Sequence, residues 1–196
     1  SKCQTNALPK MISETAKSLY KILSGAKISR GSNRTGIIAA CVFNACKECG
    51  APRSPNELAS IFDIDPKVMT KGCKNYTEII RISKTDISRV HKIKSIDLND
   101  FITRFSHKLQ LDDKQIRRIN HVSFLCQDLH LISDNTPPSM ASGCIYLYVK
   151  VLKLEISKKD ISYVCKISEV TINKCAKKLE ASGIIMDYLR NLMQGE

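Results

Sequence analysis

The chain lacks several features that membrane proteins and enzymes need. Its longest run of apolar residues, from Ile37 to Phe43, has seven residues, far fewer than the roughly 20 that a membrane-spanning helix requires. It contains no Gly-rich phosphate-binding loop of the Walker type and no pair of carboxylates on one predicted helix face. The sequence therefore predicts no membrane partner and no enzymatic activity.

Proline and glycine are also scarce, with six and eight copies in 196 residues. These two residues interrupt regular structure, and no run alternates polar and apolar residues as a half-buried strand does. Long stretches instead repeat apolar residues at spacings of three and four. The pattern predicts an all-α protein.

The nine cysteines form an odd set, and most lie within apolar helical patterns. Such usage is typical of a reducing intracellular setting and not of a disulfide framework. Cys46 and Cys49 have the spacing of metal ligands, but no second Cys-x-x-Cys pair follows to complete a four-ligand zinc site. Packing in the core is the favoured role for this pair, and we expect this chain to hold no metal and no cofactor.

The chain is strongly basic, with 31 Lys and Arg residues against 19 Asp and Glu residues, a formal charge of +12 and a pI near 9.3. An excess of this size favours polyanionic partners such as nucleic acid or an acidic membrane surface. The net charge does not indicate which fold the chain adopts.

The sequence contains an internal repeat. A shift of 103 residues aligns residues 8–76 with residues 111–179 without a gap, and the apolar positions keep their register. The capping-box serine Ser54, which opens a short helix through Pro55 and Glu57, falls on Ser157. Two copies of one helical domain explain this match. The predicted organisation is a first copy at residues 1–81, a linker at residues 82–98 and a second copy at residues 99–196.

The two copies are predicted to differ at their starts. In the first copy, a helix is expected to begin near Pro9 and the next one after a loop at residues 30–33. In the second copy, Asn99-Asp100 is expected to cap an additional opening helix, for which the first copy has no room. Since the chain also begins at Ser1 instead of Met, we expect further residues upstream.

The end of the second copy has the spacing of a helix-turn-helix. A short helix from Ser157 to Cys165 is followed by a three-residue turn and by a helix from Glu169. The residues predicted to face inward are Ile172, Cys175, Ala176 and Leu179, and those predicted to face outward are Val170, Thr171, Asn173, Lys174, Lys177 and Lys178. A groove-reading helix needs short polar or methyl-bearing side chains for base edges and cations for phosphates. A core hairpin with solvated lysines has the same pattern, and both interpretations stay open at this point.

Several stretches in this order resemble the core domain of the transcription factor IIB family. They are Ala40–Cys46, Gly50–Ser54, the Lys-rich helix from Pro66, Phe101–Phe105, Ala141–Tyr146 and Val170–Asn173. Each motif is short, but together they cover nearly the whole chain. The many Lys, Ile, Ser and Asn residues are also typical of an AT-rich genome, such as that of a large DNA virus or a divergent eukaryote.

The resemblance implies an all-α tandem pair of cyclin-like five-helix repeats, the first lacking its opening helix. It implies a general transcription initiation factor that clamps the TATA-binding protein on promoter DNA and positions RNA polymerase. The implied DNA contacts are Val170, Thr171, Asn173, Lys174, Lys177, Lys158, Lys159 and Arg53. The implied contacts with the TATA-binding protein are Lys67, Lys71 and Lys74. Asn173 departs from the family, which has Arg there; Arg favours guanine, whereas Asn favours adenine.

The resemblance also implies a monomer located in the nucleus, or in the cytoplasm for an archaeal or cytoplasmic viral protein. The zinc ribbon that precedes the core in the family lies outside this chain. Two further functions remain open from the residues alone. One is a cyclin-type or retinoblastoma-like adaptor that binds protein, and the other is a basic helical RNA-binding protein.

Overall fold

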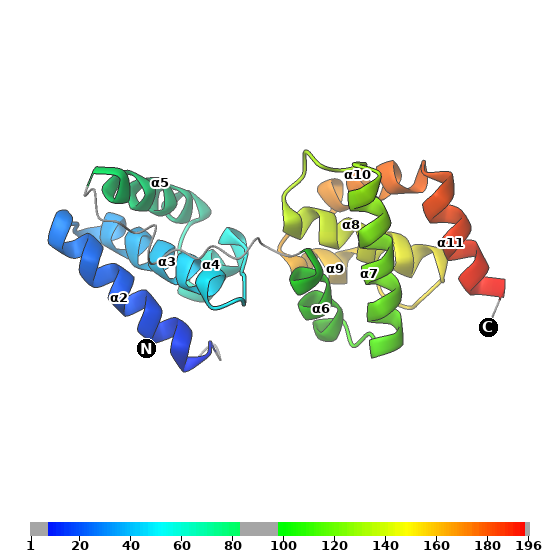
Figure 1. The fold of residues 1–196 in the computed structure, drawn as a ribbon, viewed down its shortest axis with the longest axis horizontal. Coiled ribbons are helices and arrows are strands. Elements are labelled where there is room, and N and C mark those ends of the chain that lie inside the picture. Colours follow the sequence, from blue (N-terminus) through cyan, green and yellow to red (C-terminus); the bar gives the residue numbers. More distant parts are fainter. Residues whose placement is uncertain (1–7, 83–97, 195–196) are drawn as a thin grey trace. The chain divides into compact units, whose positions relative to one another are not determined.

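The computed structural model describes residues 8–82 and 98–194. Within these ranges every regular element is a helix (Figure 1), which confirms the all-α prediction. The helices are α2 (Lys10–Ala26), α3 (Gly31–Glu48), α4 (Pro55–Phe62), α5 (Pro66–Ile82), α6 (Leu98–Lys108), α7 (Asp113–Asp128), α8 (Pro137–Val151), α9 (Lys158–Cys165), α10 (Glu169–Glu180) and α11 (Gly183–Gln194). None of the described helices has the length and apolar composition that crossing a membrane requires.

The chain divides into two compact units, residues 1–96 and 97–196. The centre of the first unit is α3, which packs against α2, α4 and α5. Its residues from Ile37 to Cys46 are buried or half-buried, as expected for a helix that is apolar on nearly every side. The helix begins at Gly31, within the predicted loop, because the carbonyl of Arg30 already accepts the Arg34 N–H at 3.4 Å.

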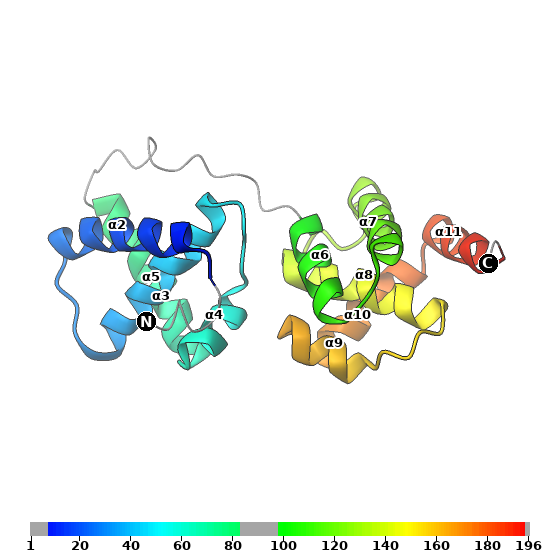
Figure 2. The same ribbon diagram turned by 90° about the horizontal axis from the view of Figure 1, so that it is seen from below.

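The centre of the second unit is α8, which packs against every other helix of that unit (Figures 1 and 2). The helix is buried from Ala141 to Val149 except at the half-buried Tyr146. Tyr148 is among the largest fully buried side chains of the described residues. The core of each unit is therefore built around the helix that carries the longest uninterrupted apolar run of that unit.

The backbone repeats with the predicted 103-residue offset. Lys10 starts α2 and Asp113 starts α7, and the same offset relates the starts of α4 and α9 and those of α5 and α10. The turn after the short helix also repeats, because Asp63 has φ 53° and Lys166 has φ 55°. The two copies thus share their cap positions and their left-handed turn residues, which confirms the tandem-repeat prediction.

The helix boundaries differ from the predicted ones at both ends of the linker. The opening helix of the second copy begins at Leu98, so Asn99-Asp100 lies in its first turn and does not precede it. Of the predicted linker, Ile82 and Leu98 belong to helices, and residues 83–97 lie outside the described residues. Residues 1–7, where the first copy was expected to lack its opening helix, also lie outside them.

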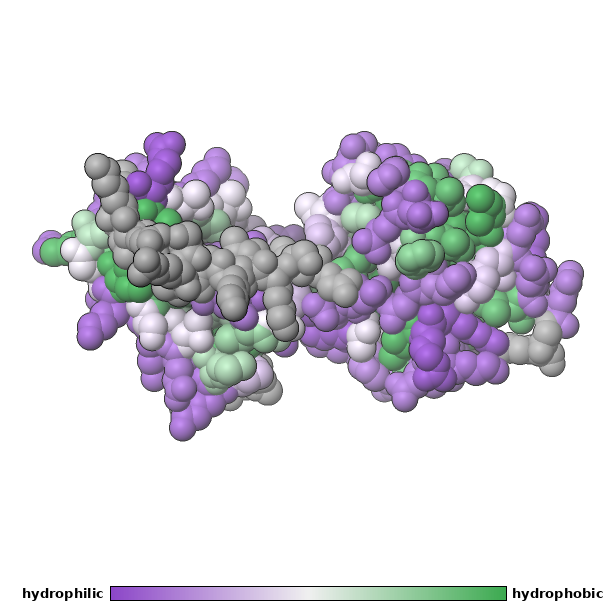
Figure 3. Space-filling view, viewed as in Figure 1, coloured by the Kyte–Doolittle hydropathy of each residue, from purple (hydrophilic) through white to green (hydrophobic). Residues whose placement is uncertain are grey.

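In the second unit, the five helices α6 to α10 are followed by a further helix, α11, that the sequence pattern did not predict. This helix, α11, packs against α7, α8 and α10 through the buried side chains Ile185 and Leu189. Ile184 on α11 and Phe124 on α7 stay exposed, at 57% and 62%. Figure 3 shows a hydrophobic area on the second unit where Figure 1 draws α7, α10 and α11.

Candidate nucleic-acid interface

The first helix of the helix-turn-helix, α9, begins with a complete capping box. The Ser157 hydroxyl accepts the Asp160 N–H at 3.1 Å, and the Asp160 carboxylate accepts the Ser157 N–H at 3.0 Å. The hydroxyl also donates to that carboxylate, and this hydrogen bond, followed by the one from the backbone, lowers the pKa of Asp160. These two hydrogen bonds from Ser157 hold the Asp160 carboxylate at the start of α9.

The turn between α9 and α10 is held by side chains at both ends. The Ser162 hydroxyl donates to the carbonyl of Ile167 at 2.7 Å. Ser168 is the N-cap of α10, and its hydroxyl accepts the Thr171 N–H at 3.2 Å. These bonds fix the angle between the two helices, which determines how α10 meets any partner.

The second helix, α10, buries the side chains that the sequence predicted to face inward: Ile172, Cys175, Ala176 and Leu179. On the opposite face, Val170, Lys174 and Lys177 are exposed at spacings of four and three, so they form one stripe along the helix. We call these three residues the α10 stripe. Val170, at the N-terminal end, is 64% exposed.

Thr171 and Asn173 lie on either side of the α10 stripe and are half-buried. The Thr171 hydroxyl oxygen is 2.9 Å from that of Ser168, so part of its hydrogen-bonding capacity is used within the cap. Val170 and Lys174 consequently form the middle of the exposed surface, and Thr171 and Asn173 form its margins.

The two predicted lysines of α9 differ in their surroundings. The Lys158 ammonium is 3.7 Å from the Glu169 carboxylate and 5.9 Å from the centre of the Tyr146 ring. Lys159 is exposed. The positive charge of Lys158 is therefore partly compensated inside the helix-turn-helix, a pairing between neighbouring helices that periodicity does not indicate.

In the first unit, α5 carries the other predicted lysines. Lys67, Lys71 and Lys74 are exposed and lie on one face of the helix. By the 103-residue offset they correspond to Val170, Lys174 and Lys177, so we call them the α5 stripe. The two stripes differ in chemistry at the helix start, where the first unit has a lysine and the second a valine.

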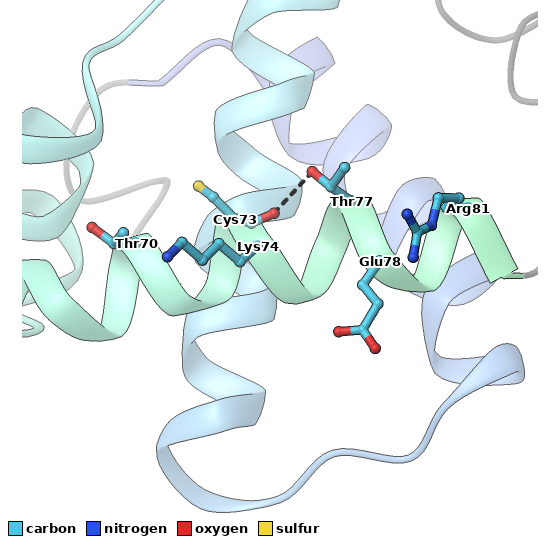
Figure 4. A pocket seen from close by; sticks show the side chains of 6 residues that line it. All are labelled: Thr70, Cys73, Lys74, Thr77, Glu78 and Arg81. Atoms are coloured by element: carbon cyan, nitrogen blue, oxygen red, sulfur yellow. Dashed lines mark hydrogen bonds between the residues drawn. The ribbon is translucent and has the colours of Figure 1, made fainter.

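Two grooves flank the α5 stripe. Figure 4 shows the groove on one side, where Lys74 lies along α5 and the Thr77 hydroxyl donates to the Cys73 carbonyl at 3.1 Å. The described residues that line this groove are Thr70, Cys73, Lys74, Thr77, Glu78 and Arg81. Burial raises the pKa of Cys73, while the nearby Lys47 ammonium lowers it by a smaller amount.

The second groove brings Lys71 together with Lys27 and Arg30 from the connection between α2 and α3. Sequence reasoning missed Lys27 and Arg30. They lie about 40 positions before Lys71, and only the packing of α3 on α5 places them on the same groove. The basic surface of the first unit is therefore wider than the stripe alone.

Arg53 has a different environment from the other predicted DNA contacts. It is half-buried, and its guanidinium donates to the carbonyls of Ala51 at 3.2 Å and Pro52 at 3.3 Å. It lines neither of the two grooves beside the α5 stripe. The structure thus places Arg53 in its own loop, apart from the lysines of α5.

The Cys-x-x-Cys pair has the surroundings of core residues. Cys46 is fully buried, and the Cys49 sulfur is 3.7 Å from the Thr15 hydroxyl oxygen. Within residues 8–82 and 98–194, no three His, Cys, Asp or Glu side chains are grouped to hold a metal ion.

The repeat, the cyclin-like helices and the helix-turn-helix agree with the comparisons with known proteins. The model of the transcription factor TFIIB repeat matches the chain twice, at residues 2–82 and 91–182. The chain belongs to the transcription factor IIB family. The helix α11 begins directly after the second match ends.

Named relatives of this family member come from viruses, eukaryotes and archaea. A transcription initiation factor IIB-like protein of Acanthamoeba polyphaga mimivirus is 35% identical over 188 residues, which are 90% of this chain and 41% of that protein. Transcription initiation factor IIB of Dictyostelium discoideum is 26% identical over 174 residues, 89% of this chain and 51% of that protein. A transcription initiation factor IIB of Halobacterium salinarum is 23% identical over 177 residues, 90% of this chain and 53% of that protein. The chain spans about half the length of these relatives.

Proposed function

We propose that this chain acts in transcription initiation by binding the complex of the TATA-binding protein with promoter DNA and by positioning RNA polymerase there. The observation that carries the proposal is the exposed α10 stripe on a helix-turn-helix within a TFIIB-family repeat. It combines an apolar side chain at the helix start with two lysines further along. The proposal does not depend on any enzymatic activity.

In the second unit, the N-terminal part of α10 enters the major groove of the DNA. Val170 contacts the methyl group of a thymine, and Asn173 forms two hydrogen bonds with an adenine at the margin of the contact. Thr171 lies beside them against the groove wall. Lys174, Lys177 and Lys159 pair with phosphates, which orient the protein without reading sequence. Lys158 contributes less because Glu169 compensates its charge.

In the first unit, the α5 stripe is cationic along its whole length, so it binds charge without reading bases. Its three lysines contact the TATA-binding protein and the adjacent phosphates, and Lys27 and Arg30 extend this basic surface. The loop that carries Arg53 approaches DNA on the downstream side of the TATA box. An entirely cationic stripe beside a basic groove favours an anionic surface over a neutral one.

Contact with RNA polymerase, a monomeric state and a location in the nucleus or in the cytoplasm follow from family membership alone. The relatives are named as transcription initiation factors, and they extend well beyond the region that this chain matches. These parts of the proposal concern the whole protein.

An electrophoretic shift assay tests the proposal. A TATA-containing duplex is incubated with the chain alone, with the TATA-binding protein alone and with both, and a duplex without a TATA box is the control. We expect a supershift that needs both proteins and the TATA box. A cyclin-type adaptor would produce no supershift. A general RNA-binding protein would shift nucleic acid without the second protein and would prefer RNA.

A further inference from the structure

The short connection between α2 and α3 holds two residues in settings that folding alone does not favour. Ile28 is 83% exposed, although Leu131, which corresponds to it in the second unit, is half-buried. Arg30 is the N-cap of α3, and its side chain makes no cap hydrogen bond. Serine, threonine, aspartate or asparagine at that position would stabilise the helix. Residues that depart from such local rules are expected at functional sites.

Both residues line the second groove beside the α5 stripe, which has a volume of about 690 Å³. The described residues that line it are Lys27, Ile28, Ser29, Arg30, Asn33, Lys71 and Asn75. Three of these residues are cations and none is a carboxylate. None of the three cations forms an ion pair with a carboxylate of the described residues. The groove therefore presents positive charge that the described part of the chain does not compensate.

The second unit does not repeat this arrangement. By the 103-residue offset, Lys27 corresponds to His130. Arg30 corresponds to Ser133 by the same offset. The second unit forms the two corresponding helices, α7 and α8, without either cation. Lys27 and Arg30 are therefore not required by the fold of the repeat, which favours a role in binding.

The side chains of the groove indicate the chemistry of the ligand. The amides of Asn33 and Asn75 have no hydrogen-bond partner within the described residues, so they add donors to the three cations. This set of donors exceeds what one carboxylate can accept. A phosphorylated side chain matches it better, because it has three strong acceptor oxygens and a charge of about −2.

The exposed Ile28 distinguishes a peptide from a nucleic-acid backbone. An aliphatic side chain among cations adds apolar contact area, which a sugar-phosphate backbone does not match and a neighbouring apolar side chain of a peptide does. Basic clusters that contain arginine recognise phosphorylated peptide segments. The combination of charge and apolar surface therefore favours a phosphorylated protein segment over DNA or RNA.

We propose that this groove binds a segment of a partner protein in which a phosphorylated side chain follows an aliphatic one. Arg30 donates two N–H groups to the phosphate, and Lys27 and Lys71 neutralise its charge. Ile28 contacts the aliphatic side chain. The site goes beyond the proposed function, because it requires neither promoter DNA nor the TATA-binding protein.

Fluorescence anisotropy with the full chain and the labelled peptide Gly-Leu-phosphoserine-Gly-Gly tests the phosphate contact. The same peptide with serine or aspartate in place of phosphoserine should bind about tenfold more weakly. Arg30→Ser should weaken binding of the phosphopeptide about tenfold and should not destabilise α3, because serine is a favourable N-cap. Lys21→Ala is the matched control, since it removes one exposed cation of α2 outside the groove. It should change the affinity less than about twofold.

Ile28→Ala tests the peptide contact separately. It should weaken binding of the leucine peptide about threefold and leave a phosphopeptide with glycine in place of leucine unaffected. No effect of Ile28→Ala, with a loss in Arg30→Ser, would indicate a bare phosphate such as that of nucleic acid and would overturn the peptide partner.

Two other outcomes would also contradict the site. Equal losses in Arg30→Ser and Lys21→Ala would mean that the peptide is attracted only by the net charge of the chain. Equal binding of the aspartate peptide would rule out recognition of phosphate. Because no measurement includes promoter DNA, each result is independent of whether the proposed function holds.

Discussion

Gly36 of α3 and Gly72 of α5 meet backbone to backbone where these two helices cross. A Cβ atom on Gly36 would lie 2.7 Å from the carbonyl oxygen of Val68, and one on Gly72 would overlap the backbone of Gly36. The second unit achieves the corresponding close approach with Gly143 of α8, where an added Cβ would lie 2.5 Å from the Cβ of Cys175. Cys175 corresponds to Gly72 by the 103-residue offset, but Gly143 corresponds to Ala40. The small residue on the central helix has thus moved by one turn between the copies.

Gly72→Ala should destabilise the chain by about 1–3 kcal/mol, because the added methyl group meets backbone that cannot move aside. This loss should exceed the gain of about 1 kcal/mol that alanine usually brings to a helix interior. Urea denaturation followed by circular dichroism measures the change. Gly25→Ala in α2 is the control, because nothing lies within 4 Å of its added Cβ. Equal effects of the two substitutions would contradict a tight crossing at Gly72.

Lys174→Ala and Lys177→Ala should weaken the complex with the TATA-binding protein and DNA for all DNA sequences alike. Each should also make the salt slope shallower by about 0.9 if it removes one phosphate contact. Fluorescence anisotropy over a range of salt concentrations provides both quantities. Lys10→Ala serves as a control for charge alone, because Lys10 is exposed on α2 and is 3.8 Å from Glu14. A salt slope equal to that of the unchanged chain would show that the lysine in question makes no phosphate contact.

Asn173→Ala should change which bases are preferred upstream of the TATA box, by roughly 1–3 kcal/mol for the base pair that the side chain contacts. Asn173→Arg should shift that preference from adenine toward guanine. Selection from duplexes randomised upstream of the TATA box measures both effects. The same selected sequence for all three proteins would show that Asn173 does not read a base.

Glu169→Gln should strengthen DNA binding at low salt, because it releases the charge of Lys158 and removes a carboxylate at the start of α10. The gain should be modest, since the pair is partly exposed and ion pairs of this kind contribute about 0–1 kcal/mol. Anisotropy titration at 50 mM salt is the measurement. The double variant Glu169→Gln with Lys158→Gln should lose this increase in DNA affinity. If the double variant still binds more tightly, the effect comes from Glu169 alone.

The free energy of unfolding should fall at alkaline pH. Burial raises the pKa of the Cys41 thiol to about 12, whereas an exposed thiol titrates near pH 9.0. The folded chain therefore keeps a proton that the unfolded chain loses, so this contribution is complete below pH 9 and is lost as the pH rises toward 12. The loss from this thiol should approach about 1.4 kcal/mol per pH unit.

Urea denaturation from pH 7 to 10.5 tests this prediction, with Cys41→Ala as the comparison. The variant should be less stable at pH 7 because it leaves a small cavity, but its stability should fall less steeply with pH. A decline remains in the variant because burial also raises the pKa of Cys73 and Tyr76. Parallel pH curves for the two proteins would contradict the assignment to Cys41.

Much of the fold was predictable because its signals are local. Apolar spacing identified the helices, and Ser54 and Ser157 identified the starts of α4 and α9 as capping boxes. The helix α11 was missed because Ile185 and Leu189 form only a short amphipathic pattern. That pattern becomes recognisable as part of the core once α7, α8 and α10 are present to cover it.

The candidate site was likewise predictable in part, where its signals are local. The outward face of α10 was predictable from helical spacing, since the buried Ile172 and Leu179 determine which residues point away. The compensation of Lys158 by Glu169 depends on the angle between two helices. The meeting of Lys71 with Lys27 and Arg30 depends on how α3 packs on α5.

The sequence by itself determined most of the helices, the capping boxes of α4 and α9, the two copies and the two stripes of outward residues. Each of these follows from interactions within a few turns of chain, where the helical period and cap chemistry decide the outcome. Only the tertiary structure decided where the helices cross, which lysines keep their charge available and which residues meet on one groove. These depend on contacts between segments far apart in the chain, and their distances are set by how whole helix faces pack together.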